Sequence, residues 1–195
     1  MKTLKLSAII LLFSFISAGC QKDDIFELDI GDENAVIQKE VNGIEFKFCL
    51  LNEQGEPATV FNEGENFTFH FSFKNNTQDT IIVSPKFVND DFFRVFSIQN
   101  SKKQDLGKPY DKVWCSPLYV ITPNPLIIKP ANTGGLECPW VLMEGYNAIP
   151  FCVNERKEYL DIGRYFTKLE LDFQYSKGKK EFKINDKFKI NFEIK

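Results

Sequence analysis

The sequence predicts an all-β fold in which antiparallel strands pack as a two-layer sandwich. The chain of 195 residues contains 20 phenylalanines and many runs of valine, isoleucine and threonine, and such side chains favour strands. Apolar and polar residues also alternate along several segments, whereas the period of an amphipathic helix is nearly absent. About 155 residues follow position 40, enough for one core, so a single domain is expected over 41–195.

The first 19 residues have the features of a secretory signal peptide. Lys2 and Lys5 precede an apolar run over 6–16, and small residues follow at 17–19. The run is shorter than the roughly 20 apolar residues that a transmembrane helix needs. We therefore expect a cleaved signal peptide over 1–19.

Cys20 follows these small residues, and the order resembles the lipobox of bacterial lipoproteins. The resemblance implies that diacylglycerol is joined to the Cys20 sulfur, that the chain is cleaved before it, and that the new amino group is acylated. Several acyl chains would hold the protein on membrane lipid, because one chain alone binds marginally. An ordinary signal peptide with a chance cysteine is the alternative.

The four residues after the cysteine are similar to the surface-export signal of Bacteroidota lipoproteins: Gln21, Lys22, Asp23 and Asp24. This similarity implies an outer-membrane protein exposed at the cell surface. The periplasmic face of the same membrane is the alternative.

Residues 20–40 are expected to form a tether between lipid and domain. They carry acidic side chains without a clear period, which is typical of a solvated segment. Apolar residues over 25–30 suit a tether less well, and a first strand at the domain edge is the alternative for them.

The charge of the mature chain disfavours nucleic acid as a partner. Loss of Lys2 and Lys5 with the signal would leave 22 basic residues against 27 acidic ones, a net charge of about −5. Lysines near the carboxyl end alternate with apolar residues, as on a solvated strand face. No zinc-ligand spacing occurs, so neither a metal nor a cofactor is expected.

The clearest strand lies over 65–74, where every second residue is phenylalanine. This period of two predicts that the rings face a core while the intervening polar residues face water. His70, the only histidine, falls on the polar face, where we expect a solvated side chain and not a metal ligand. Residues 75–79 are expected to turn the chain into the next strand.

Similar alternation predicts strands around 44–50, 92–98 and 169–175. Residues 176–180 form a predicted turn, and apolar residues continue at even positions over 182–194. The last two strands are therefore expected to form a hairpin.

Gly163 and Tyr165 precede this hairpin and resemble the tyrosine corner of immunoglobulin-like sandwiches. Together with the aliphatic strand and proline over 126–130 and with Trp140, the order resembles an immunoglobulin-like domain of the BsuPI proteinase-inhibitor type. The resemblance implies an immunoglobulin-like antiparallel β-sandwich.

Four cysteines follow Cys20 and are candidates for disulfides: Cys49, Cys115, Cys138 and Cys152. An even number in an exported chain predicts at least one bridge, with three possible connectivities. Buried thiols are the alternative. The chain departs from the inhibitor family in these cysteines and in insertions over 100–112 and 144–156, so no inhibitory loop can be assigned to named residues.

No pattern for catalysis is found. The sequence contains no glycine-rich phosphate loop, no GxSxG and no HExxH, and neighbouring acidic residues at 90–91 would point to opposite faces of a strand. Cysteine–histidine catalysis would need a thiolate beside His70, which export disfavours. The chain is therefore expected to be no enzyme but a binding module for a protein or glycan ligand. The alternative is a proteinase inhibitor that uses a loop of the sandwich.

The aromatic and proline-rich segment over 114–125 is the best candidate for a binding loop, with Tyr110, Trp114 and Tyr119 as its candidate residues. Packing beneath a long connection is the alternative for these rings.

Asp79, Thr80 and Ile81 resemble the short O-glycosylation motif of Bacteroidota. The resemblance implies a sugar on the Thr80 hydroxyl. An ordinary β-branched strand residue is the alternative.

Overall fold

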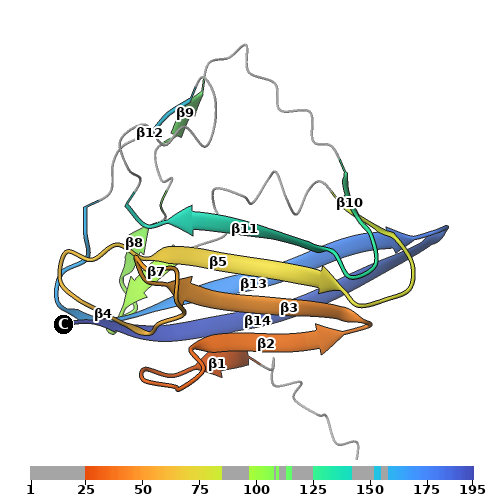
Figure 1. Ribbon diagram of the computed structural model, residues 1–195. Coiled ribbons are helices and arrows are strands. Elements are labelled where there is room, and N and C mark those ends of the chain that lie inside the picture. The colour runs from red at the N-terminus through yellow and green to blue at the C-terminus, as the bar shows by residue number, and fades with distance from the viewer. Residues whose placement is uncertain are drawn as a thin grey trace, which may run out of the picture.

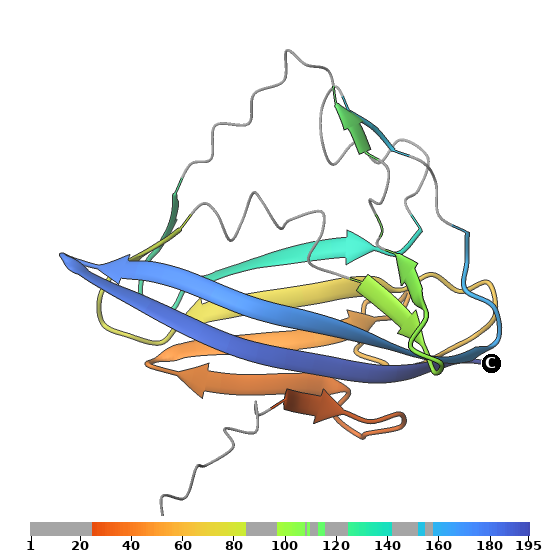
Figure 2. The same cartoon turned by 180° about the vertical axis from the view of Figure 1, so that it is seen from behind.

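The computed structural model describes residues 25–84, 97–107, 109, 113–115, 125–141, 152–154 and 158–195. Two sheets face each other across a core, as Figure 1 shows, and the view from behind in Figure 2 shows the same two layers. Within these ranges every regular element is a strand. The prediction of an all-β, immunoglobulin-like sandwich is confirmed. The described part of the chain contains no helix that could cross a membrane.

The first sheet is built on the carboxyl-terminal hairpin. Strands β13 (Gly163–Lys177) and β14 (Lys180–Ile194) pair in antiparallel register over their full length of 15 residues each. β6 (Ile81–Val83) and then β10 (Leu126–Ile128) follow beyond β13, and β1 (Ile25–Leu28) lies beyond β14. The predicted hairpin is therefore confirmed.

Three short strands complete this sheet. β4 (Val60–Phe61) pairs with β14, β7 (Ser97–Asn100) pairs with β13, and β8 (Asp105–Gly107) pairs with β7. The pairings of β1 and β4 with β14 are parallel, whereas the sequence predicted antiparallel pairing alone. Of the strand expected over 92–98, residues 92–96 lie outside the described ranges.

The second sheet has four antiparallel strands in the order β11 (Thr133–Pro139), β5 (Thr68–Asn75), β3 (Ile44–Leu51) and β2 (Val36–Val41). A separate two-stranded pair consists of β9 (Val113–Cys115) and β12 (Cys152–Asn154).

Aromatic rings from both sheets fill the core. On β5, Phe69, Phe71 and Phe73 are at most 1% exposed, which confirms the face that the alternation predicted. The ring centroid of Phe73 lies 4.8 Å from that of Phe173 on β13, and Phe46 on β3 lies 5.2 Å from the same ring. Edge-to-face pairs of this kind add to the hydrophobic gain from burial.

The sandwich begins inside the segment expected to be a tether. β1 docks at the sheet edge, as the alternative proposed, and the Phe26 ring lies 6.0 Å from that of Phe188. The Lys39 ammonium on β2 lies 3.8 Å above the Phe26 ring and 2.7 Å from the Asp186 carboxylate. These contacts explain why charged residues are found within a strand here.

The tyrosine corner is present. The Tyr165 hydroxyl donates a hydrogen bond of 2.7 Å to the Asp161 carbonyl, and a Cβ atom at Gly163 would lie 3.3 Å from that hydroxyl oxygen. Trp140 is buried, and its indole donates to the Glu158 carbonyl at 3.0 Å. The side chains of Trp140 and Tyr165 thus donate to two carbonyls in the segment just ahead of the hairpin, those of Glu158 and Asp161.

Two buried asparagines connect strands where backbone pairing ends. The Asn66 amide donates to the Val141 carbonyl and accepts from the Val141 amide, at 2.7 and 3.0 Å. The Asn75 amide donates to the carbonyls of Asp79 and Ile128. These bonds satisfy backbone groups that would be costly to bury unpaired.

Candidate functional site

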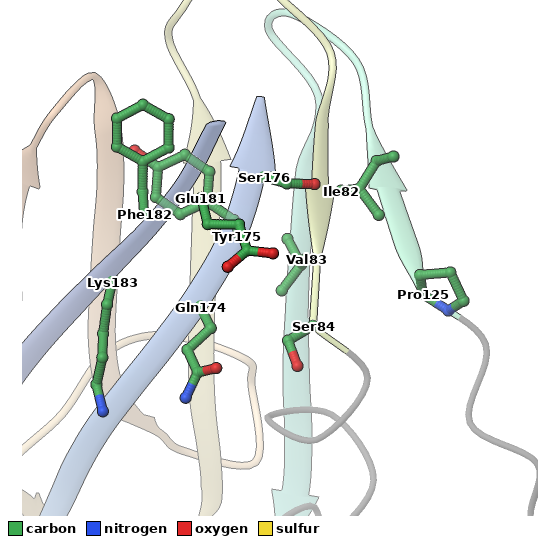
Figure 3. Close-up of a pocket in the computed structure, with 10 residues that line it drawn as sticks. All are labelled: Ile82, Val83, Ser84, Pro125, Gln174, Tyr175, Ser176, Glu181, Phe182 and Lys183. Carbon is green, nitrogen blue, oxygen red and sulfur yellow. The ribbon is translucent and has the colours of Figure 1, made fainter. Parts of the chain in front are cut away.

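An open hollow of about 460 Å³ lies near the turn of the β13–β14 hairpin, beside β6 and β10. We call it the hairpin hollow, and Figure 3 shows the ten residues that line it: 82–84, Pro125, 174–176 and 181–183. Its volume falls within the usual range for small-ligand sites, roughly 300–1,000 Å³.

The hollow lies beside the pairing of β6 with the hairpin. β6 contacts β13 through only two register pairs, Tyr175 with Val83 and Ser176 with Ile82. The Ser84 amide donates to the Gln174 carbonyl at 2.8 Å, just after β6 ends. The hairpin continues past this point, and its outward side chains border the opening.

Polar groups and apolar surface alternate in this hollow. Ile82 is 43% exposed, and Ile127, its register partner on β10, is 62% exposed. In the part of the chain that the structure describes, the side chains of Ser84, Ser176 and Glu181 have no hydrogen-bond partner. Two hydroxyls and a carboxylate are thus available to a ligand beside an apolar strip.

Aromatic rings support the wall of the hollow. The rings of Tyr175 and Phe182 are stacked, with centroids 5.1 Å apart and planes at 14°. Burial raises the pKa of the Tyr175 phenol, and the nearby Lys177 charge acts in the opposite direction. The phenol therefore stays neutral near pH 7.

A second open hollow, of about 610 Å³, lies around Phe166 on the outer side of β13. The ammonium groups of Lys168 and Lys189 lie 5.4 and 5.2 Å from the centroid of the Phe166 ring. Lys189 and Asn191 both donate to the Glu27 carboxylate, and these hydrogen bonds lower the pKa of Glu27. Several polar side chains of this second hollow thus already bond one another. The hairpin hollow has more side chains without a hydrogen-bond partner in the described part of the chain.

Cys49, His70 and Glu137 lie in one row across β3, β5 and β11. The ring of His70 is 2.7 Å from the Glu137 carboxylate, so the histidine is on the outer face, as predicted, but is paired. The free thiol of Cys49 lies opposite it in the register of β3 and β5. Burial raises the pKa of the Cys49 thiol to about 11, so it remains protonated near pH 7 and is a poor nucleophile.

The cysteines divide into two groups. Cys49 and Cys138 are buried thiols. They pair with His70 and Phe69, adjacent residues of β5, so their side chains point to opposite faces of the sheet. A bridge between these two is not formed. Cys115 and Cys152, in contrast, are register partners in the β9–β12 pair.

The other predicted site residues are only partly within the described ranges. The lipidation and export residues over 20–24 lie outside them, as do Tyr110 and Tyr119. Trp114 is placed on β9 by its backbone alone. Thr80 is exposed and immediately precedes β6, so its hydroxyl is accessible.

The hairpin hollow was not anticipated from the sequence. The alternation over 169–175 indicated that Gln174 faces outward, but nothing local indicates that β6 would pair beside it. Within the described ranges, no cluster of histidine, cysteine, aspartate and glutamate could hold a metal ion.

No family model matches this chain, and no curated protein does. Among solved structures, an ASH/PapD-like domain of human CEP192 (PapD-like domain 7) is 8% identical, covers 82% of this chain and 92% of its own, and has a TM-score of 0.33. The CooA pilin subunit from enterotoxigenic Escherichia coli is 10% identical, covers 76% of this chain and 98% of its own, and has a TM-score of 0.25. Likeness at this level says nothing about ligand or activity.

Proposed function

We propose that this chain is a lipid-anchored lipoprotein of the outer membrane, exposed at the cell surface, whose sandwich is a non-catalytic module that binds a short glycan in the hairpin hollow. The observation that carries the proposal is the placement of two unbonded hydroxyls and one carboxylate beside exposed apolar surface.

A glycan suits this lining because a sugar ring presents hydroxyl groups at its edge and apolar C–H groups on its faces. Ser84, Ser176 and Glu181 can bond the hydroxyls, while Ile82 offers apolar contact. A protein ligand is the competing outcome. It would cover far more surface than this hollow, about 800 Å² on each partner. Inhibition of a proteinase is the alternative function, and no contact in the described part of the chain favours it.

The position of β1 is compatible with a membrane anchor. Residues 21–24 alone separate Cys20 from β1, and the five steps from Cys20 to Ile25 span at most about 18 Å when fully extended. An acylated Cys20 would therefore hold the sandwich close to the lipid surface.

Binding is tested by calorimetric titration of the purified protein with a panel of neutral oligosaccharides. Glu181→Ala is expected to weaken binding of the best oligosaccharide about tenfold or more, because a charge-assisted hydrogen bond contributes about 1.5–3 kcal/mol. Arg164→Ala, in the hollow around Phe166, is the matched control and should bind as the parent does. Equal affinity of both variants would remove the hairpin hollow as the site.

Anchoring is tested separately, by labelling cells with a fatty-acid analogue. Cys20→Ala should lose the label and leave the membrane fraction. Changing Lys22, Asp23 and Asp24 to alanine should keep the label but protect the protein from protease added to intact cells. Label on the Cys20→Ala variant, or equal protease accessibility, would contradict the respective part of the proposal.

Glycosylation at Thr80 remains a prediction, to which the structure adds that the residue is exposed. The intact mass of protein from its native host should exceed polypeptide plus lipid, and Thr80→Ala should abolish the difference. A mass that matches polypeptide plus lipid alone would make Thr80 a structural residue only.

A further inference from the structure

Strands β9 and β12 pair outside the two main sheets, as Figure 1 shows. Each has three residues, and Cys115 is the register partner of Cys152. Two residues that are 37 positions apart in the sequence are thus brought directly opposite each other. A ribbon this short is not stable in water by hydrogen bonding alone, so a covalent link would explain why these two segments pair.

The backbone placement suits such a link. Residues directly opposite in an antiparallel pair have Cα atoms about 4.5 or 5.5 Å apart, and disulfides join Cα atoms about 4.4–6.8 Å apart. The other two cysteines of the domain lie on opposite faces of the second sheet as thiols. Of the six pairs that four cysteines allow, only Cys115–Cys152 is in register.

We propose that Cys115 and Cys152 form a disulfide, and that Cys49 and Cys138 remain thiols in the mature protein. The bridge closes a loop that begins at β9, contains β10 and β11, and ends at β12. The segment over 114–125, predicted as a binding loop, starts at this bridge.

The bond forms by thiol–disulfide exchange. The Cys115 and Cys152 thiols lose two protons and two electrons, and an S–S bond joins their sulfurs. The electrons pass to the disulfide of a thiol–disulfide oxidoreductase, which takes up two protons and leaves as a dithiol. Formation in the cell rests on the proposed export, because disulfides persist in oxidising compartments. Formation in vitro with oxidised glutathione does not depend on export.

The test is peptide mapping by mass spectrometry without reduction, after thiols are alkylated in acidic denaturant. We expect the Cys115 and Cys152 peptides to be joined, with a mass lower by two hydrogen atoms than their sum, and Cys49 and Cys138 to be alkylated. The variant Cys115→Ser should release Cys152 for alkylation, whereas Cys49→Ser, the matched control, should leave the joined peptide unchanged.

Two preparations separate this proposal from the proposed location. One is protein from the native cell envelope, and the other is protein refolded with oxidised glutathione. Alkylation of Cys115 and Cys152 in both, or linkage of either to Cys49 or Cys138, overturns the pairing. A joined peptide in the refolded protein alone supports the pairing and counts against export.

Discussion

The two faces of β13 carry phenylalanine in opposite surroundings. Phe173 points into the sandwich, is fully buried, and lies against Phe46 and Phe73. Phe166 lies seven positions earlier, on the other face, where it is half-buried and flanked by the ammonium groups of two lysines. The face of the strand, and not the residue type, therefore decides whether a ring stabilises the fold or shapes the surface.

Phe173→Ala, on the buried face of β13, should lower the free energy of unfolding most. It removes a ring that contacts both sheets, and truncation of a buried phenylalanine lowers the free energy of unfolding by about 3–5 kcal/mol. Urea denaturation followed by circular dichroism measures the change. An unchanged midpoint would mean that the inner face of β13 does not hold the sheets together.

Tyr165→Phe tests the contribution of a hydroxyl on a packed ring near the start of β13. The ring stays packed against that of Phe192, 5.6 Å away, but the Asp161 carbonyl loses its donor. We expect a loss of about 1–3 kcal/mol in the free energy of unfolding, the cost of leaving one partner unsatisfied. Tyr159→Phe, at a residue that is 45% exposed, is the control and should have no measurable effect. Equal stability of the two variants would show that the corner hydrogen bond contributes nothing.

Phe166→Ala tests the outer face directly. Each lysine above the ring contributes about 0.5–1 kcal/mol at an exposed site, and little core contact is lost. We expect the loss of both lysine contacts to lower the free energy of unfolding by about 1–2 kcal/mol, measured in parallel with Phe173→Ala. A loss as large as that of Phe173→Ala would break the distinction between the two faces.

Thr167→Val should have the smallest effect, and with the opposite sign. Thr167 is fully buried next to Phe166 in the sequence, and within the described part of the chain its hydroxyl has no hydrogen-bond partner. Because valine has nearly the same shape and no hydroxyl to desolvate, the free energy of unfolding should rise by up to about 1 kcal/mol. Chemical denaturation checks this, and a clear loss of stability would indicate a partner for the hydroxyl.

Local alternation predicted most of the sandwich correctly because one face of each strand is buried. The phenylalanines of β5 and the even positions of β14 have a period of two that depends on nothing distant. β2 was missed, since its buried Ile37 is followed by Gln38 and Lys39. The Lys39 side chain finds its partners, Asp186 and Phe26, only in the folded chain.

The candidate site was less predictable than the fold. Ile82 and Ser176 become neighbours only through the pairing of β6 with β13, which joins residues more than 90 positions apart. The hydrogen bonds from the Asn66 side chain to Val141 and from the Asn75 side chain to Ile128 likewise join residues far apart in the sequence. Residue type alone indicates a polar side chain at such positions but not the partner that makes it necessary.

The parallel pairing of β1 with β14 determines how the domain resists mechanical force. Four register pairs join the strands, from Ile25 with Lys187 to Leu28 with Ile190, and Glu27 adds side-chain bonds to Lys189 and Asn191. A pull on the chain ahead of Ile25, directed along the strand, loads all these contacts in shear at once, whereas a pull away from the sheet breaks them one after another. A force along β1 would therefore detach it less readily than an equal force directed away from the sheet.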